Sequence, residues 1–156
     1  MFMKLSELIS EDLVLPELKS TDVSGVLKEF SETICRTGNF SDPETLYARL
    51  YEREKQESTG IGNGIAIPHC KVENLNQVLL AVGYSPDGVD FKAIDGKKTF
   101  FLFLVISPSG SAVLHLRALA ALSRLLKSPN FVSHLQQRPS PQELITFLKK
   151  EEESTP

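Results

Sequence analysis

Hydrophobic positions in the first third of the chain recur at intervals of three and four residues, which is the spacing of one face of an α-helix. The positions that follow this spacing are Val23, Val26, Leu27, Phe30 and Ile34. Asp22 stands where a helix-capping side chain is expected, and Gly38 where a helix commonly ends in a left-handed residue. The pattern therefore predicts a helix near Val23–Thr37.

A second helix is predicted near Pro43–Glu57. Either Ser41 or Asp42 caps it, and Pro43 suits the first turn, where a backbone N–H has no partner inside the helix. Further along, the same apolar spacing predicts a long helix near Ala112–Lys127. Pro129 follows it and ends it.

The last part of the chain carries two more helical patterns. A short helix is predicted near Asn130–Gln136 and a final one near Pro141–Lys150. Ser140 and Glu143 form the Ser-x-x-Glu pattern of a capping box, which marks the start of the final helix. Residues 151–156 follow, of which the first three are glutamates, and we expect them to form a disordered acidic tail.

Strand patterns fill the middle of the chain. Ile65–Ile67 is expected to be a short strand and Val78–Tyr84 a buried one. Thr99–Ile106 is apolar on both faces, which is typical of a central strand covered by helices on both sides. Asp87-Gly88 and Asp95-Gly96 are pairs that favour turns.

This mixture of strands and helices predicts an α/β fold with one mixed sheet flanked by helices on both faces. The chain has 156 residues, which is the size of an ordinary single domain. It shows no internal repeat or linker, so we expect one domain over residues 1–150, followed by the tail over 151–156.

The composition excludes several classes of protein. The net charge of −3 argues against a nucleic-acid binder, which normally presents a basic face. No apolar run is long enough to cross a membrane, and Met1–Ser10 lacks the apolar stretch of a secretory signal. Two cysteines are too few for a disulfide framework. We therefore expect a cytoplasmic protein with reduced thiols, without nucleic acid and without direct membrane insertion.

Metal and cofactor chemistry is also disfavoured. Zinc sites take about four ligands, and the chain has only three histidines and two cysteines. The adjacent His69 and Cys70 would point to opposite sides of an extended chain. No Walker loop, serine-hydrolase elbow or dinucleotide fingerprint is present. We expect no metal and no cofactor.

A glycine-rich segment, Ser58–Gly64, is the first candidate for chemistry. Glycines at every second position let the backbone approach a ligand and adopt positive φ. Successive N–H groups of such a loop can form a concavity for an anion. A plain turn is the alternative. The candidate anion-binding residues are Thr59, Gly60, Gly62, Asn63 and Gly64.

His69 is the candidate nucleophile. Pro68 fixes its own φ and holds Ile67 extended, which stiffens the backbone before His69. Phosphoryl transfer depends mainly on positioning, so a stiff support suits a nucleophile. The alternative is a histidine at a strand end that only bonds to a backbone carbonyl.

Two further side chains have both a functional and a structural interpretation. His115 shares the inward face of the long helix with Leu119, Leu122 and Leu126. It is either a core histidine bonded to a carbonyl or a donor at the rim of an anion pocket. Arg53 belongs either to a solvated charged helix end or to a phosphate site, where its planar fork would bind oxygens.

Residues 58–69, with the sequence STGIGNGIAIPH, resemble the active-site segment of the type-2 IIA domains of the bacterial phosphoenolpyruvate-dependent phosphotransferase system. The segment is most similar to the nitrogen-regulatory branch, and the fructose- and mannitol-type IIA domains are close relatives. The resemblance covers about Leu5–Lys149 and implies the mannitol-IIA-like fold, a mixed sheet between helices.

The resemblance also implies roles for individual residues. His69 is expected to be phosphorylated on Nε2, and His115 and Arg53 to stabilise the phosphoryl group. The implied donor is HPr, the small phosphocarrier, or its nitrogen-branch counterpart. Two features depart from the family pattern: Cys70 stands where many relatives have glycine, and Ser107–Val113 is serine-rich.

Three functions remain open at this stage. The first is a regulatory phosphocarrier, a phosphohistidine protein whose phosphorylation changes its binding to target proteins. The second is a transport component that passes the phosphoryl group to a separate IIB partner. The third is a binding module of the same fold without phosphorylation.

Overall fold

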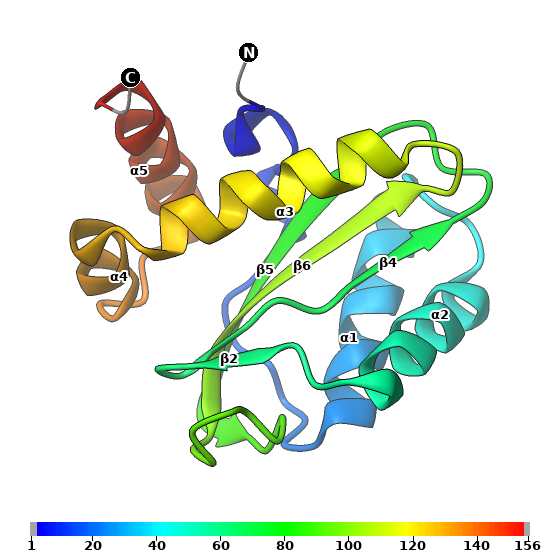
Figure 1. The fold of residues 1–156 in the computed structure, drawn as a ribbon, viewed down its shortest axis with the longest axis horizontal. Helices are drawn as coiled ribbons and strands as arrows, with labels where there is room; N and C mark the ends of the chain where they lie inside the picture. The colour runs from blue at the N-terminus through cyan, green and yellow to red at the C-terminus, as the bar shows by residue number, and fades with distance from the viewer. Residues whose placement is uncertain (1–2, 155–156) are drawn as a thin grey trace.

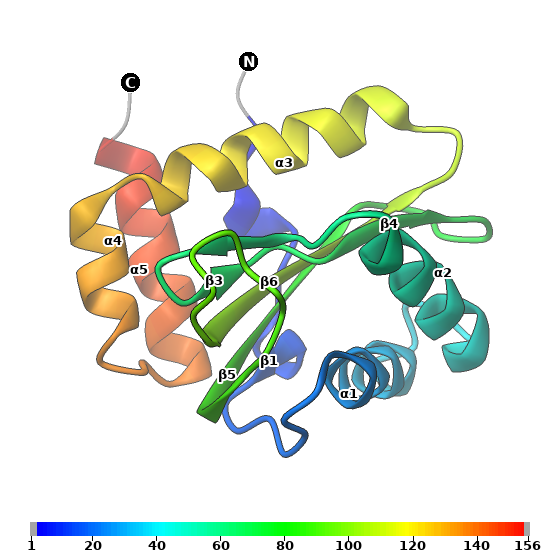
Figure 2. The ribbon, with the colours of Figure 1, turned by 60° about the horizontal axis from the view of Figure 1, so that its bottom comes forward.

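A computed structural model describes residues 3–154 of the chain. One sheet lies between two layers of helices (Figures 1 and 2). In Figure 2, α3 crosses the upper face of the sheet, whereas α1 and α2 lie below it, and α4 and α5 pack together at one end. Among the described residues, no helix is long and apolar enough to span a membrane.

The sheet has six strands in the order β1-β5-β6-β3-β2, and β4 also pairs with β6 beyond the end of β3. The strands are β1 (Val14–Leu15), β2 (Gly60–Gly62), β3 (Ile65–Ala66), β4 (His69–Val72), β5 (Leu79–Val89) and β6 (Thr99–Pro108). The β5–β6 and β2–β3 pairs are antiparallel, and the other pairs are parallel. The predicted mixed sheet with flanking helices is therefore confirmed.

The first two helices and the last one begin where capping residues predict. They are α1 (Val23–Arg36), α2 (Pro43–Gln56), α3 (Ala112–Leu126), α4 (Pro129–Leu135) and α5 (Pro141–Ser154), with short 3₁₀ turns at Leu5–Glu7 and Glu11–Leu13. Asp22 accepts from the Gly25 N–H to cap α1. Asp42, not Ser41, caps α2 by accepting from the Thr45 N–H.

Strand β6 is the central strand, as its apolar sequence predicts. It pairs with β5 on one side and with β3 and β4 on the other. Its side chains from Phe101 to Ser107 are buried on both faces. Parallel pairing of β4 with β6 places His69 opposite Val105, so the centre of the fold fixes the start of β4.

The structure differs from the sequence prediction at Asp87-Gly88. This pair lies inside β5 and forms no chain reversal. The register with β6 shifts between Tyr84 and Val89, and Gly88 has a φ of 82°. Positive φ at a glycine serves a β-bulge as well as a turn, which explains the error. Asp95-Gly96 does form a turn, closed by the Gly96 N–H and the Ala93 carbonyl.

The final helix also differs from the prediction, because it continues to Ser154 instead of ending near Lys150. Glu152 accepts hydrogen bonds from the backbone and hydroxyl of Ser6. Glu151 accepts from the Asn130 side chain. These contacts order Glu151 and Glu152 in the last turns of α5, so the predicted disordered tail is wrong for these residues. Residues 155–156 of that tail lie outside the described residues.

Candidate functional site

His69 is the first residue of β4, and the strand holds its backbone. The Val105 N–H on β6 donates to the carbonyl of Pro68, the residue just before it, at 3.0 Å. Pro68 itself is buried, and the side chain of His69 is half-buried. The expected stiff support for this histidine is therefore present.

The His69 ring is oriented by a backbone carbonyl. Its Nδ1 lies 2.8 Å from the carbonyl oxygen of Ile67. A carbonyl only accepts, so Nδ1 carries the ring proton and Nε2 keeps its lone pair. Burial lowers the pKa of His69, and the Arg53 charge lowers it further, against an opposing effect of the Ile67 bond. The lowered pKa favours the neutral ring at pH 7, in which Nε2 has a lone pair without a proton.

His115 lies beside His69. It stands in the first turn of α3, and the centroids of the two rings are 5.5 Å apart at an interplanar angle of 52°. Its Nδ1 lies 2.6 Å from the hydroxyl of Ser107, not from a carbonyl. Burial, His69 and Lys71 together lower the pKa of His115 to about 4. His115 is thus a buried neutral histidine that also lies against the candidate nucleophile.

Arg53 lies in the last turn of α2, a helix that packs against β4. Its Nη1 donates to the carbonyl of Glu57 at 2.9 Å. Within residues 3–154 it forms no salt bridge, although glutamates flank it on both sides. Its charge lowers the pKa of His69, which places the guanidinium within electrostatic reach of the ring. Its positive charge is therefore available to an anion at His69.

The glycine-rich segment forms a β-hairpin and not an open loop. Gly60 pairs with Ala66, and Asn63 and Gly64 turn the chain with φ of 58° and 79°. The segment's expected free N–H groups are largely engaged. The N–H groups of Thr59, Gly60 and Asn63 donate to Glu54, Ser58 and Asp95, respectively. None of these three contacts supports anion binding by the segment, which stays a prediction.

The hairpin instead supports the His69 ring indirectly. The Thr59 carbonyl accepts from the Ile67 N–H at 3.0 Å, and Ile67 in turn holds the ring through its own carbonyl. Glu54 on α2 binds Thr59 through both the N–H and the hydroxyl, at 2.7 and 2.6 Å. The segment thus connects α2 to the backbone that orients His69.

Cys70 is turned away from this chemistry. It is buried, and burial raises the pKa of its thiol to about 12 despite the nearby positive charge of Arg49. Thiolate is therefore scarce at neutral pH. Among residues 3–154, no group of three or more histidine, cysteine or carboxylate side chains is placed to hold a metal ion.

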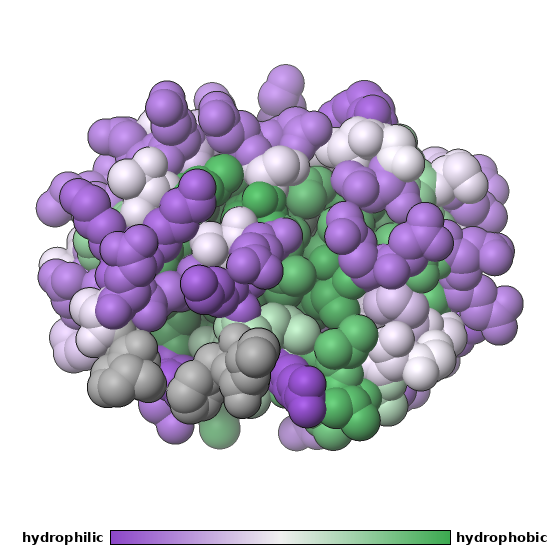
Figure 3. Space-filling model, turned by 90° about the horizontal axis from the view of Figure 1, so that it is seen from above, coloured by the Kyte–Doolittle hydropathy of each residue, from purple (hydrophilic) through white to green (hydrophobic). Residues whose placement is uncertain are grey.

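Apolar side chains surround His115 on the outside of the molecule. Val113, Leu114 and Leu116 are 61%, 39% and 66% exposed, although each is a large hydrophobic residue. Figure 3, which views the molecule from above, shows hydrophobic surface among hydrophilic side chains on the side where α3 runs. Such exposed apolar surface next to a reactive group is typical of a docking site for another protein.

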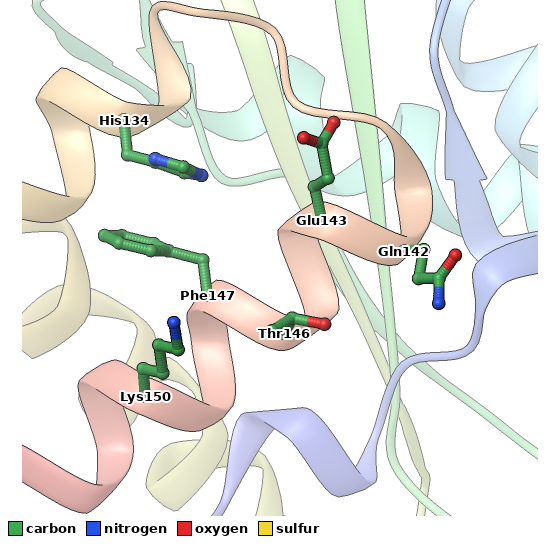
Figure 4. Close-up of a pocket in the computed structure, with 6 residues that line it drawn as sticks. All are labelled: His134, Gln142, Glu143, Thr146, Phe147 and Lys150. Carbon is green, nitrogen blue, oxygen red and sulfur yellow. The ribbon is translucent and has the colours of Figure 1, made fainter.

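A separate pocket of about 360 Å³ lies between α4 and α5 (Figure 4). The ring of His134 stacks on Phe147 with centroids 3.8 Å apart. Helices α4 and α5 lie at the opposite end of the molecule from β4 in Figures 1 and 2. The pocket is therefore separate from the start of β4, where His69 stands.

Two partners of the site residues were not found from the sequence. The acceptor for His69 is a backbone atom, for which no sequence signal exists. The Ser107 hydroxyl lies in the strand before α3, and the serine-rich stretch that contains it gave no sign of its partner.

Comparisons with known proteins show which proteins this chain resembles. The chain is 31% identical over 148 residues to the fructose-specific EIIABC component of the phosphotransferase system from Bacillus subtilis, covering 95% of this chain and 23% of that protein. It is 30% identical to the nitrogen regulatory protein of Pseudomonas aeruginosa, covering 88% of this chain and 93% of that protein.

Solved structures show the same fold. The nitrogen regulatory protein IIA-Ntr of Neisseria meningitidis aligns with a TM-score of 0.84 at 24% identity, over 92% of this chain and 97% of that one. The mannitol IIA domain of Escherichia coli, solved in complex with phosphorylated IIB, aligns with a TM-score of 0.75 at 18% identity, over 91% and 97% of the two chains.

The sequence pattern of one family matches almost the whole chain, over residues 7–151. The chain belongs to the family described as "Phosphoenolpyruvate-dependent sugar phosphotransferase system, EIIA 2".

Proposed function

We propose that this chain is a phosphocarrier that accepts a phosphoryl group on Nε2 of His69 from a phosphorylated HPr-like protein. The observation that carries the proposal is the Nδ1–H bond of His69 to the Ile67 carbonyl. It leaves Nε2 as the one nitrogen with a free lone pair. Within this family, phosphoryl transfer is the shared activity, and His69 is the side chain here that suits it.

The step balances without a proton transfer to or from the accepting ring. The Nε2 lone pair of His69 forms the new N–P bond while the donor's N–P bond breaks, and the donor nitrogen takes back its electron pair. Nδ1 keeps its proton on the Ile67 carbonyl throughout. The phosphoryl group adds about −1.5 to −2 charges near neutral pH, by analogy with phosphoserine.

His115 and Arg53 offset that charge. The His115 ring lies 5.5 Å from the His69 ring, and Arg53 has no competing carboxylate partner among the described residues. Charge-assisted hydrogen bonds of this kind are worth about 1.5–3 kcal/mol each. These two side chains thus stabilise both the transferring group and the phosphohistidine.

The donor docks on the exposed apolar side chains beside His115. Val113, Leu114 and Leu116 would become buried against a partner that brings its own phosphohistidine to His69. We infer that the same surface serves the next partner, because that partner must reach the same nitrogen.

We favour a regulatory, nitrogen-type role, in which phosphorylation changes binding to target proteins. The segment Ser58–His69 resembles that branch, and the Pseudomonas nitrogen regulatory protein matches over 93% of its length. The second candidate is a fructose- or mannitol-type transport component that passes the phosphoryl group to a IIB partner, as the Bacillus relative's name suggests.

Reconstituted transfer tests the proposal. The chain is incubated with phosphoenolpyruvate, the first enzyme of the system and the carrier, and its intact mass is measured. We expect the mass of one phosphoryl group to be added, and the label to be lost in acid. His69→Ala should gain none, whereas full acid-labile labelling of that variant would refute the assignment.

Two further measurements refine the result. His115→Ala should keep the acceptor but transfer about 10–100-fold more slowly, since it loses one charge-assisted donor. His134→Ala is the matched control, because the side chain of this α4 residue lines the separate pocket between α4 and α5. Incubation of the phosphorylated chain with candidate IIB domains separates the two roles: rapid onward transfer favours transport.

A further inference from the structure

The two histidines of the site are held in the same way but by partners of different chemistry. Each ring is anchored through Nδ1, His69 by the Ile67 carbonyl at 2.8 Å and His115 by the Ser107 hydroxyl at 2.6 Å. A carbonyl only accepts, but a hydroxyl both donates and accepts. The Ile67 carbonyl therefore requires a proton on Nδ1 of His69. The Ser107 hydroxyl can instead either donate its own proton to Nδ1 of His115 or accept a proton from it.

Ser107 is fully buried near the end of β6. Its position in the sheet is fixed by pairing with Lys71 of β4, two residues after His69. Within residues 3–154, Nδ1 of His115 is the hydrogen-bond partner that the structure gives to the Ser107 hydroxyl. The hydroxyl is therefore placed by the same strand pair that places the nucleophile.

The positions of the Ser107 and His115 protons follow from the single hydrogen-bond partner of the Ser107 hydroxyl in the described part of the chain. If His115 donated from Nδ1, the Ser107 proton would be left buried without an acceptor, which costs about 1–3 kcal/mol. If Ser107 donates to Nδ1, the hydroxyl proton has an acceptor and the Nδ1 lone pair has a donor. The proton of the neutral His115 ring then resides on Nε2, the nitrogen with no partner among the described residues.

We propose that Ser107 is a positioning residue that holds His115 as the Nε2–H tautomer, so that the ring presents a donor to a phosphoryl group on Nε2 of His69. The site then pairs two opposite tautomers: a bare Nε2 on His69 and an Nε2–H on His115. This inference rests on the proposed function for its consequence, but the tautomer itself is a property of the unphosphorylated protein.

The opposite tautomer would harm transfer. A bare Nε2 on His115 would direct a lone pair at the phosphoryl oxygens, which only accept hydrogen bonds. The ring could then help only after gaining a second proton, and its burial beside His69 and Lys71 opposes that charge. The serine hydroxyl removes this requirement.

The first test is nitrogen NMR of the histidine side chains in the free wild-type protein at pH 7. We expect His115 to show an unprotonated Nδ1 and a protonated Nε2, and His69 the reverse. A protonated Nδ1 on His115 would overturn the proposal. This measurement uses no variant and no donor, so it stands even where phosphorylation of His69 fails.

The second test compares Ser107→Ala with Ser107→Thr, which keeps the hydroxyl. We expect Ser107→Ala to lose the single tautomer of His115 and to slow the maximal transfer rate about tenfold, with the donor's KM unchanged. Ser107→Thr should restore the tautomer and much of the rate. An Ala variant that keeps the wild-type tautomer would overturn the proposal, as would one with unchanged transfer.

Ser109→Ala is the matched control for the same strand end, because its side chain is exposed and only its backbone N–H is bonded, to Val72. It should transfer at the wild-type rate. Failure of the proposed function would appear differently: the wild type itself would take no label, while the tautomers read by NMR would stay as expected.

Discussion

His69 and His115 come from different layers of the fold, and their rings meet with centroids 5.5 Å apart. One begins a strand that is paired with β6, and the other stands in the first turn of the helix that follows β6. Strand β6 therefore fixes both histidines. Because the core of the molecule holds this strand on both faces, the distance between the two rings is set by packing and not by loop conformation.

Arg53→Gln should slow phosphoryl transfer to His69 about tenfold, because it removes a charge that offsets the phosphoryl group. It should also raise the pKa of His69, since the Arg53 charge lowers it in the wild type. Both effects are measurable, by rapid-quench kinetics and by NMR titration.

Lys55→Gln is the control for Arg53→Gln. It makes the same change in charge two residues along α2, at an exposed side chain paired with Glu52 at 3.4 Å. It should leave both the rate and the pKa of His69 unchanged. Equal effects of the two variants would show that only the net charge of the helix matters.

Stability should fall as the pH is lowered from about 6.5 towards 4. His115 has a pKa of about 4 in the folded chain, against 6.5 as its ordinary value, because burial disfavours its charged form. Between these values the unfolded chain binds more protons, so protonation favours unfolding. Between pH 6.5 and pH 4 the loss should be about 2–3 kcal/mol, measured by urea unfolding at successive pH values.

His115→Gln separates this contribution from other titrating groups. The variant lacks the titrating ring, so its free energy of unfolding should change less between pH 6.5 and pH 4. His69 contributes with the same sign, because its pKa is also lowered. A wild-type curve that is flat over this range would contradict the burial-driven shift.

The sequence predicts most of the fold because its signals are local. The starts of α1 and α2 depend on Asp22 and Asp42, whose side chains bond to an N–H three residues along. The central place of β6 follows from apolar residues on both faces. The bulge at Gly88 and the two-residue strand β1 depend instead on pairing with distant segments, which no local pattern encodes.

The site could be predicted only in part, because several of its contacts also join segments that are distant in the sequence. His69, His115 and Arg53 are candidates from the sequence, but their residue types and spacing leave structural explanations open, and only the family resemblance implies their roles. The acceptor for the His69 ring is the backbone carbonyl of Ile67, and a backbone atom cannot be predicted from residue types. The contact of Ser107 with His115 depends on how α3 folds back on β6, and the hairpin's engaged N–H groups depend on Glu54 and Asp95 from neighbouring segments.

Cys70 should be unreactive in the folded protein, which bears on whether it senses redox state. It is 7% exposed, and its pKa of about 12 keeps it as the thiol. In a Cys35→Ser background, we expect no labelling of Cys70 by a thiol reagent at pH 7.5 until denaturant is added. Fast labelling of the native chain would instead indicate that β4 opens.

Glu54→Ala should weaken both stability and transfer, although Glu54 touches no reacting group. It removes two acceptors from Thr59, at 2.7 and 2.6 Å, and leaves a buried N–H without its partner. The expected cost is about 1–3 kcal/mol of unfolding free energy. Transfer should slow as well, because Thr59 fixes Ile67, whose carbonyl orients the His69 ring.

Urea unfolding and initial transfer rates measure the two effects of Glu54→Ala separately. Glu52→Ala is the control, because that carboxylate is exposed and pairs only with Lys55 among the described residues. If the hairpin orients the ring, Glu54→Ala should slow transfer even under conditions where it is fully folded. A variant that loses stability but keeps the wild-type rate would show that the His69 ring holds its orientation without the contact between Glu54 and Thr59.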